Sequence, residues 1–289
     1  MSGRRDPWTA AARDALVQAL GAAARAFPKP GDDGARAVHG ARKELKRAAS
    51  LARWFLGVVG PAAYAPRDAA NLARRAIGRV RDLDVLPLAL EKVKCAPEVR
   101  EALMQAIALE RGEGVGVESA IVGPEIVSGL EASAQVVAGW DLADATDEAL
   151  LMALRTAYRA AKRRGRAAFA TADADELHRL RQGVVDLGHQ LQVLAPAWPT
   201  MIGAAIGELH KLRQSLGDYN DLTMLGEFAL ARRELEPEAS KALIAALLRR
   251  RKPLERRARA QFERAFAERP GAFARRISAY LAHPQGKRT

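Results

Sequence analysis

The chain has 289 residues, 49% of them hydrophobic and only 5% aromatic, and its 46 Lys and Arg exceed its 34 Asp and Glu to give a formal net charge of +12. The single cysteine, Cys95, excludes an intramolecular disulfide and a cysteine-based zinc site. No stretch approaches the ~20 uncharged apolar residues of a membrane span, and the N-terminus lacks the apolar stretch of a signal peptide. We therefore expect an all-helical protein of the cytoplasm with a polyanionic partner and no membrane contact.

Helical periodicity, punctuated by Gly and Pro, predicts four helices in each half of the chain. In the first half we expect a break in the third helix at Gly78, and the helices lie near 8–26, 35–58, 62–92 and 97–138. The fourth of these is interrupted by Gly112, Gly114, Gly116 and the pair Gly123 and Pro124. In the second half we expect a break at Gly217 and a kink at Pro253, and the helices lie near 146–170, 173–194, 200–232 and 237–282. Two four-helix bundles, 1–144 and 145–289, would together form one domain.

The two halves repeat polar residues. Residues 38–86 align without a gap on residues 177–225, and the identical pairs include His39 with His178, Arg42 with Arg181, Arg74 with Arg213, Gly78 with Gly217, Asp82 with Asp221, Leu83 with Leu222 and Leu86 with Leu225. A duplication that kept only its fold would agree mainly at apolar positions. The agreement therefore suggests an internal duplication that displays one polar surface twice.

The repeated glycines and aspartates have a structural interpretation. Gly78 and Gly217 can take the left-handed conformation that ends a helix, and Asp82 and Asp221 can accept from the free amides of the helix that follows. The alternative is that each Asp also orients an Arg at a ligand surface.

Positive charge is segregated along the chain. Residues 36–81, 155–181 and 249–264 are strongly basic, whereas residues 82–144 are acidic. On a helical wheel of the second helix the cations share an arc of about 100° opposite an apolar face, and the repeat has the same polar face. Any one block also fits a solvated helix face, and either repeated His also fits a buried structural role.

If neighbouring helices turn these rows toward a shared groove, the result is a channel of cations. Arg offers a fork of donors that matches phosphate oxygens, Lys offers a mobile point charge, and His can donate beside them. The candidate binding residues are His39, Arg42, Lys43, Lys46, Arg53, Arg74, Arg75, Arg81, Arg155, Arg159, Lys162, Arg166, His178, Arg181, His189 and Arg213.

Catalytic motifs are missing from the sequence. It contains no phosphate-binding G-x-x-x-x-G-K loop and no H-E-x-x-H motif. The nearest approach to a metal site is Asp82 with Asp84, but the second copy keeps only Asp221, with Thr223 at the other place. We therefore expect a protein that is not an enzyme and that needs no metal and no cofactor. Metal-dependent hydrolysis of phosphoanhydride bonds remains the alternative.

The segments VHGARKELKR at 38–47 and IGRVRDLDVL at 77–86, with second copies LHRLR at 177–181 and LGDYNDLTML at 216–225, resemble the CHAD family, the conserved histidine α-helical domain. This resemblance spans nearly the whole chain. It implies two four-helix bundles related by pseudo-twofold symmetry around a basic central surface, and binding of inorganic polyphosphate with attachment to polyphosphate granules. It also implies that His39, Arg42, Lys46, His178 and Arg181 face the polymer. Val185 stands where the first copy has Lys46, which leaves open an unequal contribution of the halves.

The first functional hypothesis is therefore a non-enzymatic polyphosphate binder, with granule-associated proteins as further candidate partners through the acidic fourth helix. The second is a nucleic-acid-binding protein that reads the backbone alone. The scarcity of aromatic residues favours the first, because stacking on aromatic rings contributes about 1–3 kcal/mol per base to single-strand binding. Only Trp54 lies near the basic stripe.

Overall fold

The computed structural model describes residues 7–28, 34–114, 118–171, 173–232 and 235–284, without the side chains of 34–36, 78–82, 111–114 and 118–122. Within these ranges all regular structure is helical, which confirms the predicted all-α class. The helices are α1 (Pro7–Arg25), α2 (Gly34–Phe55), η1 (Gly60–Ala63), α3 (Tyr64–Ala76), α4 (Gly78–Glu91), α5 (Pro97–Gly114), α6 (Glu118–Ala138), α7 (Asp147–Thr171), α8 (Ala174–Leu194), η2 (Ala195–Ala197), α9 (Pro199–Leu230), α10 (Pro237–Ala265) and α11 (Pro270–Ala282).

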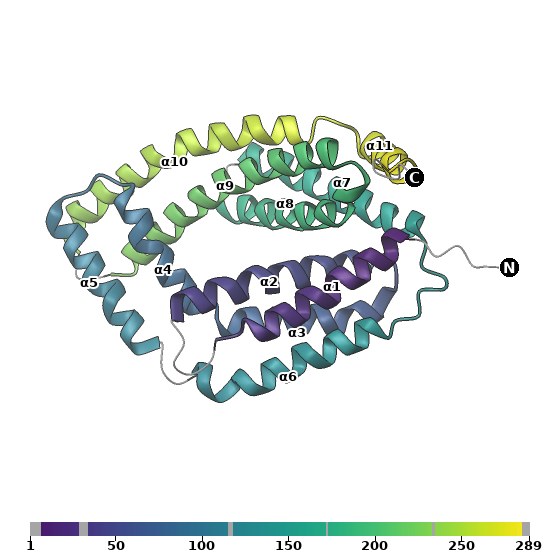
Figure 1. The fold of residues 1–289 in the computed structure, drawn as a ribbon. Coiled ribbons are helices and arrows are strands. Elements are labelled where there is room, and N and C mark those ends of the chain that lie inside the picture. Colours follow the sequence, from purple (N-terminus) through teal and green to yellow (C-terminus); the bar gives the residue numbers. More distant parts are fainter. Residues whose placement is uncertain (1–6, 29–33, 115–117, 172, 233–234, 285–289) are drawn as a thin grey trace.

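The helices form two layers that meet along α1, α2, α7 and α8 (Figure 1). In the lower layer of the view α1 and α3 each pack against both α2 and α6. In the upper layer α8 packs between α7 and α9, while α10 lies along α9 and α11 covers part of α7. The main apolar core is continuous across both layers, from Leu16 and Leu45 to Leu180 and Leu212. In the part of the chain that the structure describes, no helix is long and apolar enough to cross a membrane.

A second, smaller core lies at the end of the molecule where α4 and α5 project, at the left of Figure 1. There Leu90 of α4 and Leu103 of α5 pack with Leu225 of α9 and Leu243 of α10. The C-terminal part of α9 and the N-terminal part of α10 therefore support helices that come from the other half of the sequence.

The predicted break near Gly78 is confirmed, because α3 ends at Ala76 and α4 begins at Gly78. The joint is Ile77, at φ −104° and ψ 13°, and no side chain caps it. Asp82 lies inside α4 rather than at its N-cap, and its side chain is outside the described residues.

The predicted break at Gly217 is wrong. Helix α9 runs without interruption from Pro199 to Leu230, and both Gly217 and Asp221 lie in its interior, so Asp221 caps nothing. Gly217 lies beneath a cation from α8 instead. A Cβ at this position would be in ordinary van der Waals contact with the Arg181 guanidinium, with Nε at 3.4 Å.

The fourth helix of each half also differs from the prediction. The first is interrupted as expected, since α5 ends at Gly114 and α6 begins at Glu118, although Gly116 lies outside the described residues and Pro124 is accommodated inside α6. The second passes Pro253 without ending but stops at Ala265. A new helix starts at Pro270, because proline fits the first helical position and holds the preceding residue, Arg269, in extended conformation at φ −70° and ψ 144°.

Candidate anion-binding groove

A groove of about 620 Å³ opens between α2, α8 and α9. It brings together cations from both halves of the sequence, with one acid, Glu44, among the lining residues that the structure describes. The basic lining residues are Arg42, Lys43, Lys46 and Arg47 from α2, Arg181 from α8, Arg213 from α9, and the imidazoles of His39, His189 and His210.

The amphipathic pattern of α2 turns its cations toward the groove. Val38, Ala41 and Leu45 are buried in the main core, at 4%, 0% and 0% exposure. Because these residues face inward, His39 and Lys43 lie on the opposite side of the helix and are exposed to solvent. The predicted division of this helix into an apolar and a polar face is confirmed.

Glu44 neutralises little of the positive charge. Its carboxylate lies 3.9 Å from Lys43 Nζ and 4.0 Å from the Arg47 guanidinium, which are long distances for ion pairs. The side chain of Lys43 is 76% exposed. A pair with so exposed a cation contributes about 0–1 kcal/mol, so an incoming anion can replace the contact with Lys43 at small cost.

Arg42 and Arg181, which pair in the repeat, are held by the helices that they face. The Arg42 guanidinium donates to the carbonyl oxygen of Ile77, at the joint between α3 and α4, at 3.5 Å. Arg181 lies over Gly217 on α9. Each repeated Arg therefore lies against the segment that contains the repeated Gly.

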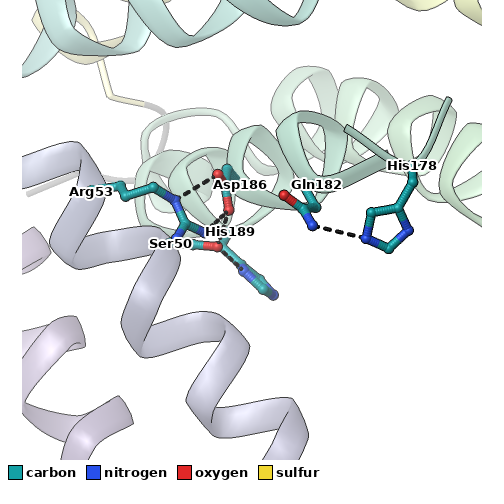
Figure 2. A network of polar contacts seen from close by, with 6 residues as sticks. All are labelled: Ser50, Arg53, His178, Gln182, Asp186 and His189. Carbon is teal, nitrogen blue, oxygen red and sulfur yellow. Dashed lines mark hydrogen bonds and ion pairs between the residues drawn. The ribbon is translucent and has the colours of Figure 1, made fainter. Parts of the chain in front are cut away.

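The two histidines of α8 lie in different surroundings (Figure 2). His178 Nδ1 lies 2.8 Å from Asn220 Oδ1, and its Nε2 lies 2.8 Å from the Gln182 amide nitrogen. An amide nitrogen only donates, so Nε2 accepts and Nδ1–H donates. His178 is not among the groove's lining residues, whereas His189 is.

Arg53, Ser50, Asp186 and His189 form a polar network between the two halves (Figure 2). Asp186 accepts two bonds from the Arg53 guanidinium, at 2.9 Å from Nε and 2.6 Å from Nη2, and a third from the Ser50 hydroxyl at 2.5 Å. Since that hydroxyl donates to Asp186, its oxygen accepts from His189 Nδ1, 3.0 Å away. Arg53 is thus occupied in joining α2 to α8 and does not line the groove.

The pKa of His189 is lowered from 6.5 to about 4, mainly by burial and also by the nearby guanidinium groups of Arg47, Arg213 and Arg53, against an opposite effect of Asp186. His189 is therefore a neutral hydrogen-bonding group at pH 7.

The lowered pKa of His189 predicts a loss of stability in acid. Between pH 6.5 and about 4 the unfolded chain binds a proton at this residue that the folded chain does not. The free energy of unfolding therefore decreases as the pH is lowered, by up to about 1.4 kcal/mol per pH unit. We expect His189→Gln to flatten this slope in urea unfolding at pH 7 and pH 5. The exposed His210→Gln is the control, and equal slopes for the two variants would contradict the prediction.

The predicted basic row of α7 lies on another face of the molecule. None of Arg155, Arg159, Lys162 and Arg166 lines the groove. Lys162 Nζ donates to the carbonyl oxygens of Ala267 and Glu268, at 3.3 and 2.6 Å, and so holds the turn that precedes α11.

The remaining candidates lie on α3 and α4. Arg74 is partly buried and Arg75 exposed at the last turn of α3, and neither lines the groove. The side chain of Arg81 lies outside the described residues.

Two basic residues that line the groove were missed by sequence reasoning. Arg47 follows Lys43 by one helical turn on α2, and His210 precedes Arg213 by three residues on α9, with 3.2 Å between the Arg213 guanidinium and His210 Nδ1. Both spacings place side chains side by side on a helix. Extending each row by one turn would have found them.

No three His, Cys, Asp or Glu side chains come together to hold a metal ion in the part of the chain described. No curated protein and no solved structure matches the chain. The CHAD domain family model matches residues 10–230, well over half of the sequence. This match covers α2, α8 and α9, the three helices that line the groove. The chain belongs to the CHAD family.

Proposed function

We propose that the chain binds inorganic polyphosphate in the groove between α2, α8 and α9, attaches in this way to polyphosphate granules in the cytoplasm, and does not turn the polymer over. The supporting observation is that cations from both halves, Arg42 to Arg47 on one side and Arg181 with Arg213 on the other, surround one trough. A phosphate chain carries negative charge on every unit. Forked Arg donors and mobile Lys charges can hold such a chain without fixing its register.

The lining chemistry favours polyphosphate over nucleic acid. No Phe, Tyr or Trp is among the lining residues of the groove that the structure describes, and Trp54 is only 2% exposed, with its indole nitrogen donating to Leu150. Single-stranded nucleic acid gains much of its binding energy from stacking on such rings. The groove therefore offers many contacts for phosphate and none of the large aromatic side chains on which bases stack best.

We infer further that the two halves are related by a pseudo-twofold axis that passes beside the groove. Ser50 and His189 occupy equivalent positions in the aligned segments, and they contact each other at 3.0 Å. A residue that contacts its own counterpart lies at the axis that relates the two copies. The crossed packing of α1 on α8 and of α2 on α7 agrees with this arrangement.

The two halves contribute unequally to the proposed site. Where α2 has Lys43, Lys46 and Arg47, the aligned positions of α8 hold Gln182, Val185 and Asp186. The first half therefore supplies most of the charge, and the polymer is expected to lie closer to α2.

A competition titration on the intact chain tests the choice of ligand. We expect long-chain polyphosphate to displace labelled polyphosphate, and duplex DNA or RNA at equal phosphate concentration to displace little. Salt dependence does not separate the two ligands, since counterion release weakens both complexes. Equal displacement by nucleic acid would identify a general reader of phosphate backbones instead.

The absence of turnover has its own test. Chain incubated with polyphosphate and Mg²⁺ or Mn²⁺ is expected to release no phosphate. Steady release that is lost in His39→Ala or His178→Ala would show hydrolysis and overturn this part of the proposal.

A further inference from the structure

The groove is continuous with further hollows on the surface of α9 and α10. A second hollow of about 490 Å³ shares Arg181 and Arg213 with it and extends between α9 and α10, where Lys211, Arg257 and Gln261 join the lining. A third hollow of about 200 Å³ shares Arg257 with the second. The three hollows therefore follow one another across α9 toward α10.

The second hollow has the donors that a phosphate chain requires. Its basic side chains are Arg181, Lys211, Arg213 and Arg257, with Gln214, Ser215 and Gln261 as neutral partners, against the acids Asp218 and Asp221. Asp218 lies 2.8 Å from Lys92 Nζ, and Lys211 Nζ lies 2.6 Å from Glu208 Oε1, so one acid and one base of the hollow each have a partner outside it. The net charge of the lining remains positive, although less strongly than in the groove.

One arginine of this hollow, Arg257, comes from a separate basic segment of the sequence. Arg257 belongs to the block 249–264 of α10, which the groove leaves unused and which lies beyond the residues 10–230 that match the CHAD family model. The apolar side of α10, with Ala258 and Phe262 buried, turns the neighbouring Arg257 toward α9.

Resting on the proposed function, we propose that the hollow between α9 and α10 is a second polyphosphate subsite, entered from the groove between Arg181 and Arg213. A long chain spans both subsites, whereas a short chain fills the groove alone. Because the second contact of a spanning chain is intramolecular, long chains bind more tightly than the same concentration of short ones.

The test compares two neighbouring arginines of α10 with two probes, long-chain polyphosphate and tripolyphosphate. We expect Arg257→Glu to weaken long-chain binding about tenfold and to reduce the salt slope by about one, and to leave tripolyphosphate binding within about twofold. Arg256→Glu makes the same charge change at an exposed position that lines none of the three hollows, and is expected to leave both probes within about twofold.

Three results would overturn the second subsite. They are equal losses of affinity in the Arg257→Glu and Arg256→Glu variants, no loss of affinity in Arg257→Glu, or an equal loss of affinity for both probes in Arg257→Glu. If Arg257→Glu fails to fold, Lys211→Glu, which lines the same hollow and not the groove, takes its place with the same expected direction. If the wild-type chain binds neither probe, the proposed function itself fails, and that result is distinct from the other outcomes.

Discussion

Reversing two charges of the groove, Lys43→Glu with Arg213→Glu, is expected to weaken polyphosphate binding at least about 100-fold while helical content and the unfolding midpoint stay unchanged. Each reversal replaces an attraction by a repulsion, worth about 1–2 kcal/mol near a solvated surface, and about 1.4 kcal/mol corresponds to a factor of ten. Both side chains are exposed, so the fold does not depend on them. Isothermal titration with long-chain polyphosphate measures the loss.

Arg42 and Arg181 are less suitable for this test although the repeat singles them out. Arg42 bonds to the backbone at Ile77, and Arg181 packs on Gly217, so their reversal would disturb helix packing as well as binding. Reversing the charges of Lys43 and Arg213 instead tests binding without disturbing the packing of the helices.

The matched control is Arg159→Glu with Arg166→Glu on α7. It changes the net charge by the same amount at two exposed positions outside the groove. We expect its affinity to stay within about threefold of the wild type, because exposed charges beyond a Debye length of about 10 Å are largely screened. If this control loses binding as strongly as the groove variant, the ligand is held by bulk charge or by the α7 row.

The polar face of α2 could be predicted because helical periodicity is a local property. Once Ala41 and Leu45 face the core, the geometry of the helix fixes the side on which Lys43 must lie. The same reasoning cannot identify the neighbour that covers a face. Arg53 lies among the predicted cations of α2, but its carboxylate partner Asp186 comes from the other half of the sequence.

The α7 row shows the same limit. Its spacing correctly places four cations along one line, but the structure covers part of that line with α11. The cause is the helix end at Ala265 and the restart at Pro270, which bring backbone carbonyl oxygens to Lys162. A prediction that continued one helix to residue 282 could not place this turn.

Glycine was the least predictable residue, because the same sequence signal precedes two different structures. Gly78 begins a new helix after the joint at Ile77, whereas Gly217 lies inside an unbroken helix, beneath Arg181. The packing around each helix, which the sequence does not give, separates the two cases.

A third glycine is expected to have the largest effect on stability. Gly165 of α7 is buried against the ring of Phe262 on α10, and a Cβ there would lie inside van der Waals contact, at 2.7 Å even from Cδ2. The ring cannot easily move, since it packs against Phe169 and Phe266 at centroid distances of 5.4 and 5.1 Å. We therefore expect Gly165→Ala to lower the free energy of unfolding by about 3 kcal/mol, despite the higher helix propensity of alanine.

Urea unfolding of Gly165→Ala and Gly207→Ala separates packing from propensity. A Cβ at Gly207 of α9 meets no atom within 4 Å, so this control is expected to gain about 0.5–1 kcal/mol. Adding Phe262→Leu should make Gly165→Ala less costly than it is in the wild-type background, because the smaller side chain leaves room for the methyl group. If Gly165→Ala is as stable as Gly207→Ala, α7 and α10 do not approach as closely as the packing of Phe262 requires.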